Sequence, residues 1–99
     1  MNQLTVVARV IEKSAIRYTP AGIPIASAIL MHSSQQVEAD KKRLVEFEIS
    51  AQAAGEISGQ FHELPLDVEV VFTGFLVRKN RNSKSLVFHV NEIRTNLLD

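Results

Sequence analysis

The hydrophobic residues of this chain gather in short segments rich in valine, isoleucine and phenylalanine, residue types that are favoured in β-strands. Residues 44–52 (LVEFEISAQ) give the clearest signal, because apolar and polar residues alternate along the segment. This alternation predicts a strand with one face buried in a core, including Phe47, and one face in solvent, including Glu46 and Glu48.

Two further strands are predicted before this segment, and a tight turn joins them. Residues 4–11 (LTVVARVI) are dominated by β-branched residues and are apolar on both faces. Pro20 fixes one backbone angle and Gly22 tolerates unusual ones, so the two residues predict a turn. Residues 23–32 (IPIASAILMH) suit a helix or a strand, and Pro24 together with three isoleucines favours the strand.

A change of period predicts one helix. Ile57, Phe61 and Leu64 are spaced i, i+4, i+7, which places them on the same face of a helix. We therefore expect a short helix within residues 53–64, packed by Ile57 and Phe61 and ended by Pro65.

Two polar stretches separate the remaining apolar segments. Residues 33–43 (SSQQVEADKKR) have mixed charge and no periodicity, so we expect a flexible loop. Residues 68–77 and 86–90 are apolar and flank the tract RKNRNSK, whose asparagines and serine favour turns. These segments predict a hairpin with a long tip that carries four cationic residues: Arg78, Lys79, Arg81 and Lys84.

The order of elements is strand, strand, strand, short helix, strand, strand, in a single domain that covers residues 1–99. Consecutive long strands in a small domain favour closure into a barrel, because closure removes exposed sheet edges. The predicted fold is therefore all-β: a five-stranded OB-fold barrel with one helix between its third and fourth strands. Such barrels bind oligonucleotides on one sheet face and through the first and last hairpin loops.

Composition narrows the classes of protein to consider. Eleven basic and eleven acidic residues balance, so nucleic-acid binding must depend on local clusters of positive charge. The absence of cysteine excludes a disulfide scaffold and fits a reducing compartment. The first residues do not resemble a signal peptide, and no apolar run approaches the roughly 18 residues of a membrane span. We expect a cytoplasmic protein without membrane contact.

No pattern predicts catalysis, a metal or a cofactor. His32, His62 and His89 lack the spacing of metal ligands. Glu46 and Glu48 share a strand face but have no apolar pocket around them, which favours solvated surface glutamates. Since no motif pairs a nucleophile with a base, we do not expect an enzyme.

Clustered cations are the best functional signal, and each cluster has a structural alternative. The basic hairpin tip predicts an anion site or a solvated turn. Arg17 beside Tyr18 predicts a phosphate contact next to a stacking ring, or a pair at a strand end that packs on a neighbour. The run from Lys41 to Arg43 extends the cationic surface or belongs to a solvated loop.

Two stretches, LTVVARVIEKSAIRYTPAGIPIASAILMH and GFLVRKNRNSKSLVFHVNEI, resemble the single-stranded DNA-binding protein superfamily and, more narrowly, the family of bacterial primosomal replication protein N (PriB). The sharpest feature is a Pro-x-Gly-Ile-Pro turn followed by a strand that ends in Leu-x-His. The resemblance spans nearly the whole chain, although residues 34–64 match only in outline.

This resemblance implies a homodimer that binds single-stranded DNA and bridges it to the PriA helicase and other primosome proteins during replication restart. It implies DNA contacts at Arg17, Arg43, Lys79, Arg81 and Lys84. To these the residue patterns add Tyr18 and Arg78.

One departure from the family bears on the function. The family carries an exposed tryptophan on its third strand as a base-stacking platform, whereas this chain has no tryptophan. The nearest residues are Glu46 and Phe47, and the alternation turns Glu46 outward and Phe47 towards the core. This departure implies that the chain binds DNA more weakly than the family pattern does. An alternative function is a protein-interaction module that mainly grips and stimulates a helicase.

Overall fold

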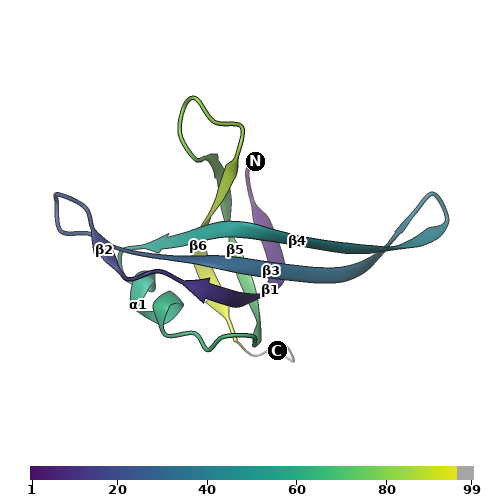
Figure 1. The fold of residues 1–99 in the computed structure, drawn as a ribbon, viewed down its shortest axis with the longest axis horizontal. Helices are drawn as coiled ribbons and strands as arrows, with labels where there is room; N and C mark the ends of the chain where they lie inside the picture. The colour runs from purple at the N-terminus through teal and green to yellow at the C-terminus, as the bar shows by residue number, and fades with distance from the viewer. Residues whose placement is uncertain (96–99) are drawn as a thin grey trace.

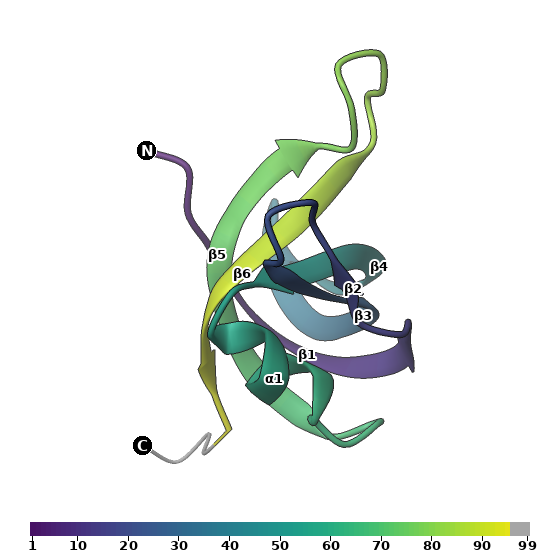
Figure 2. The same cartoon turned by 90° about the vertical axis from the view of Figure 1, so that its left-hand side faces the viewer.

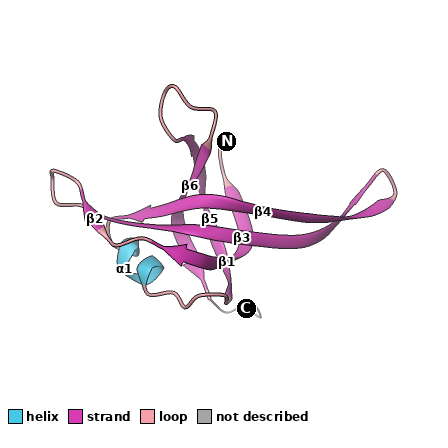
Figure 3. Ribbon diagram, in the orientation of Figure 1, coloured by secondary structure: helices cyan, strands magenta, loops and turns pink. Residues whose placement is uncertain are grey.

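Five long strands and one short helix make up the protein in a computed structural model that describes residues 1–95 (Figures 1 and 3). A two-residue strand, β2, accompanies them. The elements are β1 (Leu4–Lys13), β2 (Arg17–Tyr18), β3 (Pro24–Glu38), β4 (Lys41–Ala54), α1 (Ile57–His62), β5 (Glu69–Arg78) and β6 (Leu86–Arg94). The predicted order is confirmed, and residues 23–32 form a strand rather than a helix.

The strands close into a barrel, as predicted. Their order is β1-β5-β6-β4-β3, and an additional pairing of β1 with β3 joins the two ends of the sheet (Figure 2). The β4–β6 pairing is parallel and the others are antiparallel. The architecture is that of the predicted OB-fold. No helix in the described part of the chain is long and apolar enough to cross a membrane.

Strand β1 closes the barrel by pairing with different neighbours along its length. Its residues Leu4 to Arg9 pair with β5, and its residues from Arg9 to Lys13 pair with β3, with a register shift between Val10 and Glu12. Residues 4–8 therefore have a ladder partner on one edge only, among the residues that the structure describes.

Small residues on β3 and β4 leave room for three phenylalanines in the core. Alanines at four inward positions of these strands are buried, and Phe61, Phe72 and Phe88 fill the space between the strands and α1. Phe61 meets Phe72 edge-on, with ring centroids 6.0 Å apart. Truncating such a ring to alanine typically costs about 3–5 kcal/mol. The packing of Phe61 and the half-buried Ile57 confirms the predicted helix.

The prediction of a flexible loop at residues 33–43 is wrong. Strands β3 and β4 run on past the barrel as a two-stranded arm, defined here as residues 33–46, which projects at one end of the molecule (Figure 1). Ala39 and Asp40 join the strands with φ values of 52° and 65°, the combination that a type I′ hairpin turn requires. No Asn-Gly pair marks this turn, and neither face of the arm packs on a core, so its sequence shows no alternation.

The prediction that Phe47 is buried in the core is also wrong, although its strand face is the predicted one. Phe47 lies on the same strand face as the buried Ala51 and Ala53, but the barrel ends before reaching it, and 37% of the residue is exposed. Its ring packs against that of His32, with centroids 4.9 Å apart, at the base of the arm. Glu46 and Glu48 are exposed, as predicted.

Candidate nucleic-acid interface

A groove of about 400 Å³ crosses the outer face of β3 and β4 between β2 and the base of the β5–β6 loop. Of the described residues that line it, two are cationic and none is acidic. They are Ser14, Arg17, Ser27, Ala28, Ile29, Ser50, Ala51, Gln52, Lys79 and Val87. The groove thus contains two of the cations that the sequence indicated, Arg17 and Lys79, and its outward-facing side chains on β3 and β4 are Ser27, Ile29, Ser50 and Gln52.

Arg17 reaches the groove because the chain folds back tightly after it. Strand β2 pairs with the start of β3, which sets Arg17 opposite Ile25. In the turn between them the Gly22 N–H donates to the Thr19 carbonyl at 2.8 Å, and Gly22 has the φ of +83° that glycine adopts without strain.

Lys79 reaches the same groove from the other end of the chain. It follows the last residue of β5, and its backbone N–H donates to the Ser85 carbonyl at 2.9 Å, closing the β5–β6 loop at its base. In Figure 1 the β5–β6 loop projects at the top of the molecule, and the β2–β3 turn projects at the left, at the same end as α1.

Local hydrogen bonds shape the loop itself, as the asparagine and serine content predicted. The Asn82 N–H donates to Asn80 Oδ1 at 3.0 Å, and the Ser85 N–H donates to Ser83 Oγ at 3.0 Å. The other cations of the tract, Arg78, Arg81 and Lys84, are exposed and do not line the groove. Arg78 belongs to the end of β5, where it pairs with Leu86.

Tyr18 and Arg43 lie outside the groove. Tyr18 follows Arg17 on β2 and is 68% exposed. Arg43 lies on the arm, and its Nη1 is 2.7 Å from Glu38 Oε1. Since the arm and the β2–β3 turn project at opposite ends of the molecule (Figure 1), the fold brings Arg17 and Lys79 together and leaves Arg43 apart.

An aromatic pair that the sequence reasoning missed lies on the outer face of β5 and β6. The rings of Phe75 and His89 are 5.2 Å apart between centroids, with 35° between their planes. Phe75 is 38% exposed, whereas its neighbour Gly74 and the preceding Phe72 are buried. The alternation along VVFTGFLV could have indicated that Phe75 points outwards, but the pairing with His89 depends on strand register.

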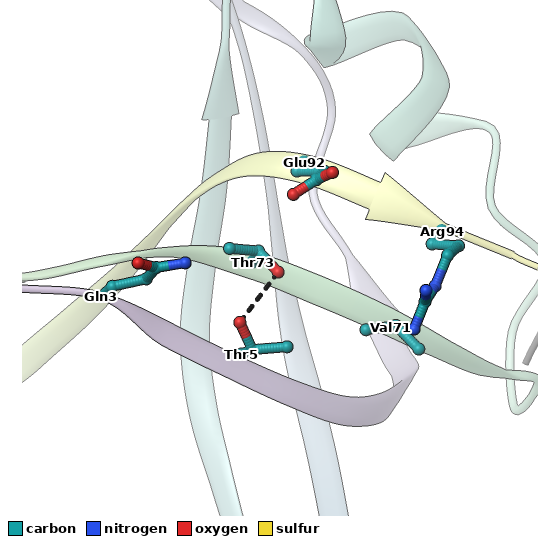
Figure 4. A pocket seen from close by; sticks show the side chains of 6 residues that line it. All are labelled: Gln3, Thr5, Val71, Thr73, Glu92 and Arg94. Carbon is teal, nitrogen blue, oxygen red and sulfur yellow. Dashed lines mark hydrogen bonds between the residues drawn. The ribbon is translucent and has the colours of Figure 1, made fainter.

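A second, smaller hollow of about 230 Å³ lies on the outer face of β1, β5 and β6 (Figure 4). Thr5 and Thr73 hydrogen-bond across it, with their hydroxyl oxygens 3.0 Å apart, and Glu92 and Arg94 line it from β6. Its charges are mixed, and it contains none of the cations that the sequence singled out. Within residues 1–95, no group of three or more histidines and carboxylates could hold a metal ion.

Comparison with known proteins places the chain among single-strand binding proteins. Residues 2–92 match a family model described as another single-strand binding protein family. Replication restart protein PriB of Bordetella pertussis is 39% identical over 94 residues, which cover 95% of this chain and 88% of that protein. The PriB protein of Nitrosomonas europaea is also 39% identical, over 94% of this chain and 86% of its own.

A solved structure agrees with these sequence matches. The crystal structure of PriB from Ralstonia solanacearum superposes with a TM-score of 0.88 at 38% identity, and the match covers 97% of this chain and 98% of the other.

Proposed function

Because the chain belongs to the PriB family of replication restart proteins, within the single-strand binding proteins, we propose that it binds single-stranded DNA in the groove between β2 and the β5–β6 loop. The observation that carries this proposal is the convergence of Arg17 and Lys79 on a groove whose described lining has no carboxylate. The role is one of binding, with no catalytic step.

Electrostatic attraction to phosphates accounts for most of the binding. Each cation that meets a phosphate releases a condensed counterion, which makes affinity fall with salt. Arg17 and Lys79 hold the backbone over the groove, and the exposed Arg78, Arg81 and Lys84 extend the positive surface along the loop. Phosphates are the same at every nucleotide, so this mode gives little sequence preference.

Two carboxylates limit the proposed DNA site on the side that faces the arm. Glu46 and Glu48 lie on the same outer strand face as Ser50 and Gln52 of the groove, and both are exposed. They repel phosphates, so the DNA path stays near β2 and the β5–β6 loop. Arg43, on the far arm and bound to Glu38, contributes less than the groove cations.

We also propose that the chain forms a homodimer through β1. Residues 4–8 of β1 have one edge without a ladder partner in the described part of the chain, and free edges favour pairing with another strand. A second copy of β1, antiparallel across a two-fold axis, would pair with this edge in both subunits. Within one subunit, the Val7 carbonyl of this segment already accepts a hydrogen bond from His32 Nδ1 at 2.7 Å.

In the cell the protein would act in the cytoplasm, holding single-stranded DNA for the PriA helicase and other primosome proteins. The alternative is a module that mainly grips and stimulates the helicase. Exposed apolar residues on the arm, Val37 and Leu44, favour this alternative because they offer a contact surface for a protein. The zero net charge favours it as well.

Fluorescence polarisation with labelled single-stranded and duplex oligonucleotides at two salt concentrations tests the proposal. Single-stranded DNA should bind more tightly than duplex, and Lys79→Ala should weaken binding. Lys42→Ala on the arm is the matched control, because it removes the same exposed charge away from the groove. Equal binding by both variants and the unchanged protein would favour the helicase-gripping alternative.

A further inference from the structure

The outer face of the barrel continues past the groove onto an aromatic surface. Register pairs Gln52 of β4 with His89 of β6, and His89 with Phe75 of β5. Gln52 lines the groove, so these three residues form one row that leads from the groove floor to the two rings. The neighbouring row runs from Ser50 to Val87 and Val77.

The rings serve no evident purpose in the core. Phe88 and Val90, which flank His89, point inwards and are buried. Phe75 and Val77 point outwards, and each is 38% exposed. An apolar, partly exposed surface beside a cationic groove suits a ligand that is aromatic on one side and anionic on the other, which describes a nucleotide of single-stranded DNA.

We propose that the Phe75–His89 ring pair is a base-stacking platform of the single-stranded DNA site. This inference rests on the proposed function and adds to it the surface that receives the bases. Arg17 and Lys79 hold phosphates over the groove, and a neighbouring base lies on the rings one strand further on. The platform gives the site a stacking surface on β5 and β6. Strand β4 offers none at Glu46, because that position carries a carboxylate instead of an aromatic ring.

Replacing Phe75 with alanine tests the platform. Loss of one stacked base should weaken binding of oligo(dT) about 5- to 150-fold. Stacking releases no counterion, so the slope of log affinity against log salt should stay unchanged, whereas Lys79→Ala should make the slope shallower. Phe47→Ala is a close control, because Phe47 is exposed to nearly the same extent and also packs on a histidine, but lies at the base of the arm.

A tryptophan reporter gives a second readout. The chain has no tryptophan, so Phe75→Trp introduces a single indole. Oligo(dT) should quench its fluorescence by direct stacking and leave Phe47→Trp unchanged. Phe75→Leu, which keeps an apolar side chain without a ring, serves if the alanine variant does not fold, and it should show the same loss of affinity.

The outcomes distinguish a failure of the stacking platform from a failure of the proposed DNA-binding function. If the unchanged protein binds oligo(dT) and Phe75→Ala or Phe75→Leu binds it equally well, the platform is overturned while the groove stands. If quenching is the same at positions 75 and 47, the platform is overturned too. If the unchanged protein does not bind single-stranded DNA, the proposed function fails and the platform with it.

Discussion

Arg17 and Lys79 line one groove although they come from opposite ends of the chain, one from the two-residue strand β2 and the other from the end of β5. The sheet order brings them together, because β4 pairs with both β3 and β6.

The salt dependence of DNA binding reports the number of phosphate contacts. If Arg17, Lys79, Arg81 and Lys84 each contact a phosphate, log affinity against log salt should slope at about −3 per subunit, at roughly −0.7 per contact. Polarisation titrations of oligo(dT) over a range of salt concentrations measure the slope. A slope near zero would contradict an electrostatic site.

Lys84 tests whether the loop beyond the groove takes part. Lys84 is exposed and does not line the groove. Lys84→Ala should make the salt slope shallower by about 0.7 and weaken binding to every sequence alike, because phosphates carry no base information. Unchanged affinity and slope would mean that the loop tip is a solvated turn, and the helicase-gripping function would then be favoured.

Glu46 should oppose DNA binding. Glu46→Lys or Glu46→Trp should tighten the binding of single-stranded DNA, the first by replacing repulsion with attraction and the second by adding a stacking surface worth about 1–3 kcal/mol. Glu63→Lys, an exposed position beside α1, is the control for net charge. If both lysine variants tighten binding equally, the effect belongs to total charge and not to this face.

Gly74 should be essential for the barrel. A β-carbon at Gly74 would lie 1.9 Å from the His89 carbonyl oxygen, and the register of β5 and β6 shifts next to it. Gly74→Ala should therefore destabilise the protein by more than about 2 kcal/mol in urea unfolding. Gly59→Ala in α1 meets nothing within 4 Å and should be neutral or stabilising by up to about 1 kcal/mol.

The dimer prediction depends on the free edge of β1. Sedimentation should show a dimer at micromolar concentration. Thr5→Lys should weaken it, because it would place a charged side chain on the strand segment that pairs in the dimer. Thr73→Lys is the control, since Thr73 shares a hydrogen bond with Thr5 but lies one strand away from the edge. A monomeric unchanged protein would contradict the proposal.

Local patterns were sufficient to predict the fold. Apolar residues repeat with the period of the element they occupy, as Ile57 and Phe61 do in α1 and Ala51 and Ala53 do in β4, because one face of the element is buried. The sequence did not predict the arm, because neither of its faces is buried and no alternation results. The burial of Phe47 was predicted wrongly, because alternation shows the face of a strand and not where the barrel ends.

The candidate site was predictable in its charges and not in its arrangement. Arg17 and Lys79 stand out as cations at turns, but their common groove depends on pairings between distant strands. Phe75 and His89 meet only because β5 and β6 adopt one register, which is shifted beside Gly74. No window of sequence contains that information.

The arm can change length only in certain steps. From Ser33 and Glu46 outwards its residues pair with one another across β3 and β4, up to the turn at Ala39 and Asp40. Deleting one complete pair, a residue from each strand, shortens the arm and preserves the register nearer the barrel. Deleting a residue from one strand alone would shift every pair beyond it and exchange the two faces. Insertions and deletions between related chains should therefore occur in matched pairs on either side of this turn.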